Sequence, residues 1–253
     1  KRAVAVVNGT AALHISLMLA GVEAGDEVIV PDLTFVAPAN AITYCNANPV
    51  FLGSDWETLG LNPAILKSFL EERCELKDGY TYNKTTGKRI SAIIPMHTFG
   101  NPVDMDPLIE LCKAANIAVV EDATESLGSS YKGSKTGTFG MLGCFSFNGN
   151  KIMTTGGGGM IVTNDEDLAN KAKHLSTTAK SDPIEYDHDA IGYNYRLVNV
   201  LAAIGVGQLE QMDEFVATKR RNYNHYIQSL SSVEGMNMFE KQDHSESNYW
   251  MYP

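Results

Sequence analysis

The sequence predicts an α/β fold with a mostly parallel β-sheet and helices on both of its faces. Short runs rich in β-branched residues alternate along the chain with longer helical patterns, and this alternation is typical of a parallel sheet. Runs such as Ile117–Val120 lack polar residues at alternate positions, which fits strands that are buried on both faces. The expected elements follow in order along the chain.

The first half of the chain repeats the strand–helix alternation several times. Each predicted strand is a short apolar run, and each predicted helix has apolar residues at helical spacing. Asn62-Pro63 is a favourable helix start, since Asn caps a helix and Pro fits its first turn. We expect strands at Val4–Val7, Glu27–Val30, Pro49–Leu52, Ala92–Pro95 and Ile117–Glu121, and helices at Thr10–Ala20, Thr34–Cys45, Asn62–Arg73 and Asp104–Ala115.

The stretch Glu72–Arg89 interrupts this alternation, because it is polar and lies between a predicted helix and a predicted strand. Tyr80 and Tyr82 favour extended backbone, whereas Asn83 and Gly87 favour turns. We interpret the stretch as a β-hairpin-like insertion on the surface.

Glycine-rich segments replace the regular alternation after Asp122. Two apolar runs, Cys144–Phe147 and Met160–Thr163, are predicted to be strands joined by a functional loop that holds Lys151 and Gly156–Gly159. The remaining predicted elements are helices at Glu166–Leu175 and at Asn199–Leu230, the latter broken near Met212–Phe215, and a strand that begins in Asn248–Pro253.

The two ends of the sequence predict an excerpt of a longer protein. An apolar run starts at Ala3, directly after Lys1-Arg2, and the last residues are again apolar and aromatic. Natural termini are usually polar and frayed. The length of 253 residues suggests roughly one and a half domains.

Composition excludes several classes of protein. With 30 Asp+Glu against 20 Lys+Arg, the formal net charge is −10, which argues against nucleic acid or an anionic membrane as the main partner. The 4 Cys are far apart and form no C-x-x-C pair, so we expect reduced thiols and no metal site. No apolar run reaches the length of a membrane span, and no signal peptide is visible. We expect a soluble, cytoplasmic protein.

The first candidate site is Asn8-Gly9-Thr10-Ala11, at a predicted strand-to-helix turn. Gly9 lets the backbone approach a ligand closely, and Thr10 and Ala11 would present free N–H groups at the helix start. Such a helix start binds anions. A simple Thr cap explains the same residues, so both interpretations stay open.

The second candidate is Asp122, which a buried strand delivers at its carboxyl end. Ligands of open α/β sheets bind at that edge, and an isolated buried carboxylate is costly without a partner. An Asp that caps the following turn is the alternative.

The third candidate is Lys151, on the loop between two apolar strands and close to the glycines of Gly156–Gly159. A partly buried amine there is a nucleophile suited to a Schiff base. A solvated lysine is the alternative. A Walker loop is excluded, because the Lys precedes the glycines and no Gly-Lys-Ser/Thr follows.

The three motifs occur in the order expected for a pyridoxal-phosphate enzyme of the aspartate-aminotransferase fold type. The chain closely resembles the sugar aminotransferases of the DegT/DnrJ/EryC1/StrS family. The matching stretches, in order, are Asn8–Leu13, Pro31–Ala37, Glu121–Gly128, Cys144–Phe147 with Lys151 five residues after Ser146, and Gly192–Leu197.

The resemblance implies a three-layer α-β-α sandwich with a mostly parallel seven-stranded sheet. It implies that residues 1–215 form the large domain that binds pyridoxal phosphate, short at its N-terminus. Residues 216–253 would then form a linking helix and the start of a small α+β domain.

The resemblance also assigns roles to the motif residues. Lys151 would hold pyridoxal 5′-phosphate through a Schiff base and later move the proton. Asp122 would pair with the pyridine nitrogen and keep it protonated. Phe35 would stack on the ring; a helix-facing core Phe is the alternative.

The cofactor phosphate would be held by the turn at Gly9, by the amides of Thr10 and Ala11, and by the Ser146 hydroxyl. Asn194 resembles the residue that reaches the phosphate of the neighbouring subunit's cofactor. The resemblance therefore implies a homodimer with shared active sites.

The resemblance bears on two further positions. Glu125 stands where the family more often has Gln or His, so its contact near the phenolic oxygen would need protonation or a hydrogen bond. His97 matches a family motif beside the site, and we expect a structural or supporting role for it.

The family's activity implies transfer of an amino group from L-glutamate to a keto carbon, C4 in our prediction, of a nucleotide-linked 4-keto-6-deoxy sugar. The insertion and the Glu125-Ser126 pair resemble members of legionaminic acid synthesis and perosamine synthases. Two alternatives stay open. One is a sensor or regulator of the same fold that binds pyridoxal phosphate without transaminase activity. The other is a nucleotide-binding α/β enzyme without pyridoxal phosphate, in which Lys151 only contacts an anion.

Overall fold

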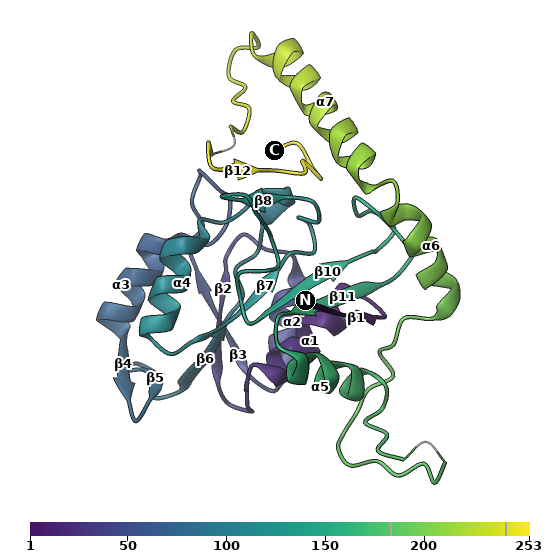
Figure 1. Ribbon diagram of the computed structural model, residues 1–253. Helices are drawn as coiled ribbons and strands as arrows, with labels where there is room; N and C mark the ends of the chain where they lie inside the picture. The colour runs from purple at the N-terminus through teal and green to yellow at the C-terminus, as the bar shows by residue number, and fades with distance from the viewer. Residues whose placement is uncertain (183, 241) are drawn as a thin grey trace.

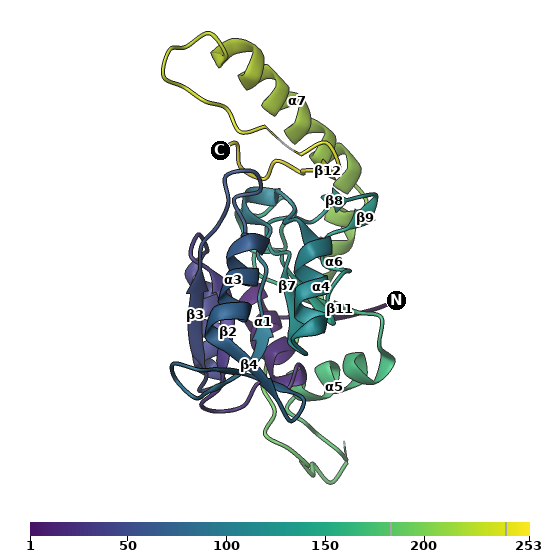
Figure 2. The ribbon, with the colours of Figure 1, turned by 90° about the vertical axis from the view of Figure 1, so that its left-hand side faces the viewer.

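A central β-sheet lies between two layers of helices in the computed structural model, which describes residues 1–182, 184–240 and 242–253 (Figure 1). Helices α1 (Gly9–Leu19), α2 (Val36–Tyr44) and α5 (Glu166–Ser176) cover one face of the sheet. Helices α3 (Pro63–Arg73) and α4 (Met105–Ala114) cover the other face, which is turned to the viewer in Figure 2. The α/β class and the three-layer sandwich are therefore confirmed.

Within the described residues, seven strands form the continuous path of the sheet, in the order β1-β11-β10-β7-β6-β2-β3. Neighbours from β10 to β3 are parallel, and β11 is antiparallel to both β1 and β10. The prediction of a mostly parallel sheet is confirmed. The strands are β1 (Arg2–Val6), β2 (Glu27–Pro31), β3 (Asn48–Leu52), β6 (Arg89–Ile93), β7 (Ala118–Asp122), β10 (Leu142–Ser146) and β11 (Gly159–Thr163).

The insertion is a β-hairpin, as predicted, made of β4 (Cys74–Lys77) and β5 (Tyr80–Asn83). Asp78 and Gly79 connect the strands with φ of 51° and 81°, the positive values that a tight two-residue hairpin turn requires. The hairpin also joins the sheet, because β5 pairs with the start of β6, where β7 has not yet begun. The sheet of the described residues therefore has nine strands rather than the seven expected.

The pleat of β2 distributes its side chains between two cores. Val28 and Val30 pack on the side of α1, whereas Ile29 packs on the side of α3 and α4. Successive residues of a strand point to opposite faces, so an unbroken apolar run supplies both cores. This is why the apolar strands of the sequence lack polar alternation.

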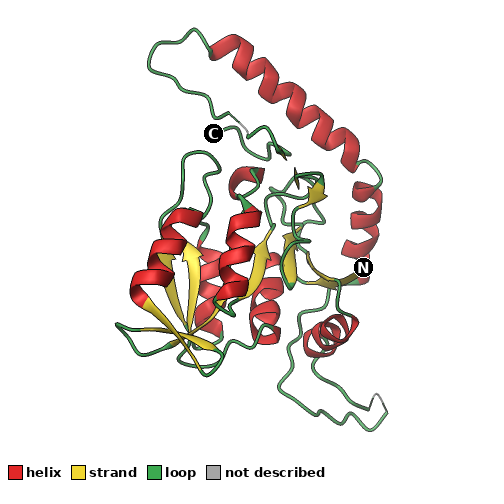
Figure 3. Ribbon diagram, turned by 60° about the vertical axis from the view of Figure 1, so that its left-hand side comes forward, coloured by secondary structure: helices red, strands yellow, loops and turns green. Residues whose placement is uncertain are grey.

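After α5 the chain leaves the sandwich and later returns to it. Helix α6 (Asn199–Leu209) is followed by the long helix α7 (Met212–Leu230), and the break falls at 210–211, slightly before the predicted position. Figure 3 shows the chain turning back beneath α7. It ends in β12 (Ser245–Glu246), which pairs with β8 (Ser130–Tyr131), itself paired with β9 (Ser134–Lys135).

The predicted strand at Asn248–Pro253 is wrong. The segment has no ladder partner, and Tyr249 has a φ of 49°, which a strand does not allow. Its first residue is instead held by side chains, since the Asn248 N–H donates to Ser129 Oγ at 2.9 Å. Apolar residues that fill a tertiary contact give the same pattern as a short strand.

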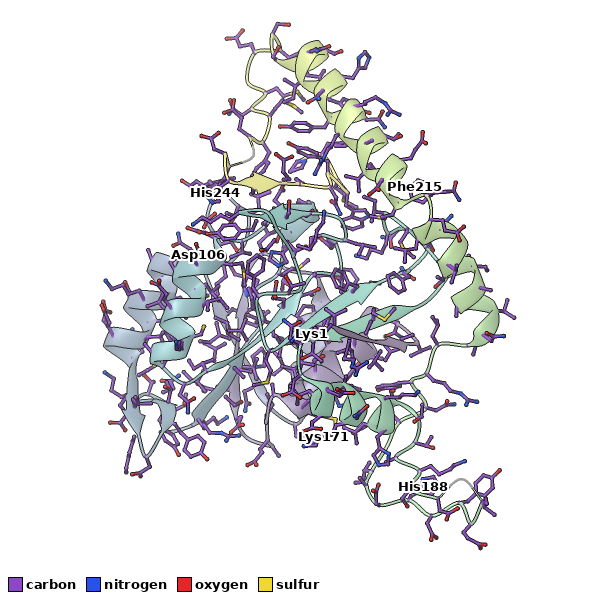
Figure 4. The ribbon with its side chains drawn as sticks, viewed as in Figure 1. Lys1, Asp106, Lys171, His188, Phe215 and His244 are labelled. Atoms are coloured by element: carbon purple, nitrogen blue, oxygen red, sulfur yellow. The ribbon has the colours of Figure 1, made fainter. Side chains whose placement is uncertain are left out.

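The return of the chain is anchored near the start of α4. The backbone carbonyl of His244 accepts the N–H of Lys132 at 2.7 Å, and Lys132 Nζ contacts Asp106 Oδ2 at 2.5 Å. Figure 4 shows His244 and Asp106 on the same side of the molecule. The segment after α7 is therefore packed on the sandwich rather than separate from it.

The proposed boundary between residues 215 and 216 falls inside α7. Met212 and Val216 pack with Phe145, Phe147 and Met153 at the end of the sheet. The first turns of α7 thus share the core of the sandwich, and the division into two domains stays a prediction.

The helices and the cysteines bear on two expectations from composition. In the described parts of the chain, no helix combines the length and the apolar character needed to cross a membrane. All four cysteines are free, as predicted, and burial raises the pKa of the Cys112 thiol to about 12.

Candidate active site

A cavity of about 310 Å³ opens at the carboxyl ends of β7 and β10, the edge where open α/β sheets bind ligands. The fold gathers into its wall residues from segments that are far apart in the sequence. Seven of the predicted site residues line it: Gly9, Thr10, Phe35, Asp122, Glu125, Ser146 and Lys151. Ala11 and Asn194 are not in the described wall of the cavity.

Asn8, rather than Thr10, caps α1. Its Oδ1 accepts the N–H of Ala11 at 2.7 Å, so the prediction of a free Ala11 amide is wrong. The helix begins at Gly9, one residue earlier than predicted, and this places Ala11 within reach of the Asn8 side chain. Thr10 lies in the first turn, where a helix offers its N–H no acceptor, and it lines the cavity.

Gly9 occupies a place where a side chain would not fit. A Cβ at this position would lie 3.0 Å from Ser146 Cβ and 3.1 Å from Thr124 Cγ2. Ser146 ends β10, and its Oγ accepts the N–H of Asn148 at 3.3 Å. The start of α1 therefore approaches the end of β10 closely, and backbone amide and hydroxyl groups meet in one part of the wall.

Asp122 ends β7 and is buried, with its Oδ1 accepting the N–H of Thr124 at 3.0 Å. Burial raises the pKa of Asp122, while the hydrogen bonds from Thr124 and the charge of Lys151 act in the opposite direction. A desolvated carboxylate in a cavity wall is costly unless a cation pairs with it. The cavity therefore favours a ligand that places a positively charged group beside Asp122.

Glu121, the residue before Asp122, is fully buried and serves a neighbouring loop. Its Oε2 accepts the N–H of Gly137 at 2.7 Å, and its Oε1 accepts the N–H groups of Phe139 and Gly140 at 2.5 and 2.6 Å. These three bonds compensate for the lost hydration of the carboxylate. The two carboxylates at the end of β7 thus have different environments: one is satisfied by backbone, and the other faces the cavity.

His97 completes the environment of Glu121. The N–H of Val103 donates to His97 Nδ1 at 3.1 Å, so this nitrogen accepts and Nε2 carries the proton toward Glu121 Oε2, also at 3.1 Å. The backbone N–H of His97 also donates to the backbone carbonyl of Asp122 at 3.1 Å. This arrangement agrees with the predicted supporting role of His97.

Replacement of Glu121 by glutamine is expected to destabilise the protein by about 3 kcal/mol, because one accepting oxygen becomes an NH₂ group that faces backbone donors. Chemical denaturation measures the change. The exposed Glu75 of β4 provides the matched control, since E75Q removes a charge without a buried partner. Equal stabilities of E121Q and E75Q would contradict the structural role of Glu121.

Lys151 extends its amine into the cavity. Its side chain is 13% exposed, and Nζ lies 3.5 Å from Glu125 Oε1. Nζ also lies 4.1 Å from the ring centroid of Trp250. The predicted partly buried lysine is therefore confirmed in its location, and an oriented amine of this kind can act as a nucleophile or as a base.

Glu125 is the carboxylate next to that amine. Its Oε2 accepts the N–H of Phe99 at 2.8 Å, and Phe99 has a left-handed backbone with φ of 55°. Burial raises the pKa of Glu125, and the charge of Lys151 and the Phe99 hydrogen bond oppose this effect. A carboxyl with a raised pKa can donate a hydrogen bond.

Replacement of Glu125 by glutamine is expected to change the pH dependence of stability of the cofactor-free protein. A carboxyl whose pKa is raised by folding stabilises the native state below its unfolded pKa and loses that contribution as the pH rises through the folded pKa. Gln does not titrate, so the stability of E125Q relative to wild type should increase between about pH 5 and about pH 8. Urea unfolding at both pH values measures this difference, and a difference that falls with pH would contradict the environment described for Glu125.

Phe35 and Asn194 lie in exposed positions. Phe35 is the N-cap residue of α2, is 66% exposed and lines the cavity, so its ring is available to a ligand rather than packed in the core. Asn194 is exposed and pairs through its backbone with Thr177. Its proposed contact with a neighbouring subunit's cofactor stays a prediction.

Several residues of the cavity wall escaped the sequence analysis. Trp250 comes from the segment interpreted as a strand, and Asn8 was taken as the start of a motif rather than as a cap. The signal for Asn8 was available, because Asn is among the strongest helix caps. No local pattern marks Trp250, since only the tertiary return of the chain brings it to the cavity.

The wall as a whole combines three chemical features. A helix start and a serine hydroxyl can hold an anion, a desolvated carboxylate can hold a cationic ring nitrogen, and an amine can form a Schiff base. Pyridoxal phosphate carries a matching phosphate, pyridine nitrogen and aldehyde. The residues present therefore fit this group.

Comparison with known proteins agrees with this fit. The model of the DegT/DnrJ/EryC1/StrS aminotransferase family matches residues 1–253. GDP-perosamine synthase of Escherichia coli O157:H7 is 43% identical over 254 residues, which cover 98% of this chain and 64% of that protein. A pleiotropic regulatory protein of Geobacillus stearothermophilus is 33% identical over 236 residues, which cover 93% of this chain and 59% of that protein.

A solved structure shows the same architecture. The DegT DnrJ EryC1 StrS aminotransferase from Brucella abortus superposes with a TM-score of 0.89 at 27% sequence identity, covering 100% of this chain and 65% of that one. The chain thus spans less than two thirds of the length of each of these three proteins.

Proposed function

Because the chain belongs to the DegT/DnrJ/EryC1/StrS aminotransferase family, we propose that it carries the cofactor site of a nucleotide-sugar aminotransferase dependent on pyridoxal phosphate. The amino donor in this proposal is L-glutamate, and the acceptor is the C4 keto group of a nucleotide-linked 4-keto-6-deoxy sugar. The single observation that carries the proposal is the presence of the Lys151 amine and the buried Asp122 carboxylate in one cavity.

Aminotransferases of this family depend on pyridoxal phosphate, which supplies an electron sink for the carbon that loses a proton. The chain would hold this group through Gly9, Thr10 and Ser146 at its phosphate. Asp122 would hold its ring nitrogen. The backbone N–H of Ala11 could bind the phosphate only if the Asn8 side chain released it, since this N–H donates to Asn8 Oδ1.

The remaining residues orient the reacting atoms. The Lys151 amine takes a proton from the donor's α-carbon and returns it, as a positioned general acid and base. Phe35 covers the ring face, and Glu125 donates or accepts at the phenolic oxygen according to its protonation.

The sugar acceptor is supported by similarity rather than by geometry. The relative named GDP-perosamine synthase is 43% identical, and its name supports a nucleotide-linked sugar as the substrate class of this chain. The C4 position belongs to the proposal, and its support is the resemblance of the motifs to the family.

We also propose that the working unit is a homodimer. Helix α6 exposes several aliphatic side chains, among them Val200, Ile204 and Leu209, and exposed apolar surface of this kind is typical of an interface. The loop that carries His188 projects from the sandwich in Figure 4 and exposes Ile184 and Ile191. Size measurement by light scattering tests the proposal, and a monomer at micromolar concentration would contradict it.

The experiment that tests the activity is the donor half of the reaction alone. Full-length protein loaded with pyridoxal phosphate is expected to convert one equivalent of L-glutamate per site to 2-oxoglutarate without sugar present. A screen of GDP- and UDP-linked keto sugars then identifies the acceptor by the return of further turnover. Failure to convert glutamate would overturn the proposed amino donor.

A second candidate function rests on the relative named as a pleiotropic regulatory protein. A regulator of this fold would bind pyridoxal phosphate through Lys151 but would release no 2-oxoglutarate from L-glutamate. The same half-reaction therefore separates the two candidates.

A further inference from the structure

We propose that Trp250 closes the cavity over Lys151 and positions its amine, so that the segment after α7 is an integral part of the site. The inference rests on the proposed function, because it assigns a task at the same lysine. It adds a residue that neither the motifs nor the family assignment single out.

The indole ring contacts the reacting atom itself. Lys151 Nζ lies 4.1 Å from the centroid of the Trp250 ring, within the range of a cation–π contact. The same amine lies 3.5 Å from Glu125 Oε1. An aromatic face and a carboxylate therefore both attract the amine and restrict where it can point.

The ring is fixed in this position by its own hydrogen bond. Trp250 Nε1 donates to the carbonyl of Asn150, the residue directly before Lys151, at 2.7 Å. Trp250 is only 7% exposed, and Asn248 and Tyr249 directly before it are buried as well. The indole thus covers the lysine rather than lying loosely on the surface.

Asn248 connects this segment to the carboxylate side of the site. Its Nδ2 donates to the carbonyls of Glu125 and Leu127, both at 2.9 Å, and its Oδ1 accepts the N–H of Trp250 at 2.8 Å. One buried amide therefore links the backbone of Glu125 to the backbone of Trp250. Asn248 thereby fixes the distance between Glu125 and Trp250, the two residues that contact the Lys151 amine.

Helix α7 holds the same segment from the other side. Lys219 Nζ donates to the Trp250 carbonyl at 2.9 Å. Figure 3 shows α7 and the returning segment adjacent to each other above the sheet. The position of α7 is thereby coupled to that of Trp250, which covers Lys151.

The proposal is tested on cofactor-free, full-length protein with an amine-specific reagent such as acetic anhydride. Peptide mass spectrometry follows the modification rate of Lys151, with the exposed Lys113 as an internal reference. We expect W250A to raise the Lys151 rate about tenfold and W250F, which retains an aromatic face, to stay within about threefold of wild type. Equal Lys151 rates in wild type and W250A would overturn the proposal.

The second tryptophan of the sequence provides the matched control. Trp56 is 89% exposed and does not line this cavity, so W56F should leave the Lys151 rate unchanged. Thermal unfolding and the Lys113 rate show whether W250A is folded. If W250A is unfolded, the proposal is tested by comparing the fluorescence of W250F with that of the wild type.

Fluorescence gives an independent readout. Pyridoxal phosphate should quench the emission of Trp250, so quenching is expected in wild type and W56F and is expected to be lost in W250F. Undiminished quenching in W250F would overturn the placement of Trp250 at the site. The proposed function can fail separately. If borohydride fixes no pyridoxal phosphate to Lys151 of the wild type, the proposed function is rejected. If W250A still raises the acetylation rate of Lys151 in that case, the inference about Trp250 is retained.

Discussion

Lys151→Ala is expected to abolish both turnover and the visible Schiff-base absorbance of the loaded protein. Alanine removes the nucleophile that would hold the cofactor and the base that would move the proton, and no other lysine is among the described residues of the cavity wall. The loss of rate should exceed about a thousandfold, since both nucleophilic and general acid–base catalysis depend on this side chain.

The measurement pairs absorbance spectra with the glutamate half-reaction. Lys113→Ala is the matched control, because Lys113 is exposed on α4 and its loss should leave spectrum and rate unchanged. A K151A protein that keeps both the absorbance and the activity would reject Lys151 as the site of attachment. Folding of K151A is checked by circular dichroism.

Asp122→Asn is expected to leave the cofactor bound but to lower the rate of the half-reaction by about a hundredfold or more. Asn has the shape of Asp and can still accept the Thr124 N–H. It cannot stabilise a protonated ring nitrogen by charge, and the electron-accepting capacity of the ring depends on that proton. Titration of the variant with pyridoxal phosphate measures binding, and single-turnover kinetics measure the rate.

In the cofactor-free protein, the same substitution is expected to increase stability at high pH, although it lowers the catalytic rate of the loaded protein. Burial raises the pKa of Asp122, so the wild type loses stability as the pH rises through the folded pKa, whereas Asn does not titrate. D122N without cofactor should therefore gain stability relative to wild type toward alkaline pH. The control is D167N, which replaces an exposed carboxylate on α5. A near-normal rate for D122N would remove Asp122 from its proposed role.

The central strands β2, β7 and β10 were predictable because each is a short, largely apolar run that is buried on both faces. Such a run constrains the backbone locally, and the pleat then supplies both cores, as Val28, Ile29 and Val30 show. The hairpin of 74–83 was predictable from a different local signal, since Tyr80 and Tyr82 favour extended backbone and the polar stretch around them contains turn residues. Its attachment to β6 was not, because it depends on where β7 begins.

The candidate site divides in the same way. Asp122 and Lys151 were identified because strand ends and strand-joining loops are marked in the sequence. The state of the Ala11 amide was misjudged, since a shift of one residue at the helix start makes Asn8 the cap. Trp250 was missed, since its neighbours in the cavity, Lys151 among them, are 99 or more residues away in the chain.

The sequence by itself determined the α/β class, the order of the elements and the chemical identity of the amine and of the carboxylate at the strand end. These depend on side-chain type and on periodicity over a few residues, which local physical chemistry specifies. Only the tertiary structure decided how the neighbouring carboxylate is held, because Glu121 accepts hydrogen bonds from the 137–140 loop while Asp122 lines the cavity. It also decided that Trp250 covers Lys151. Both outcomes depend on hydrogen bonds and packing between segments that are distant in the sequence, and no local pattern encodes those contacts.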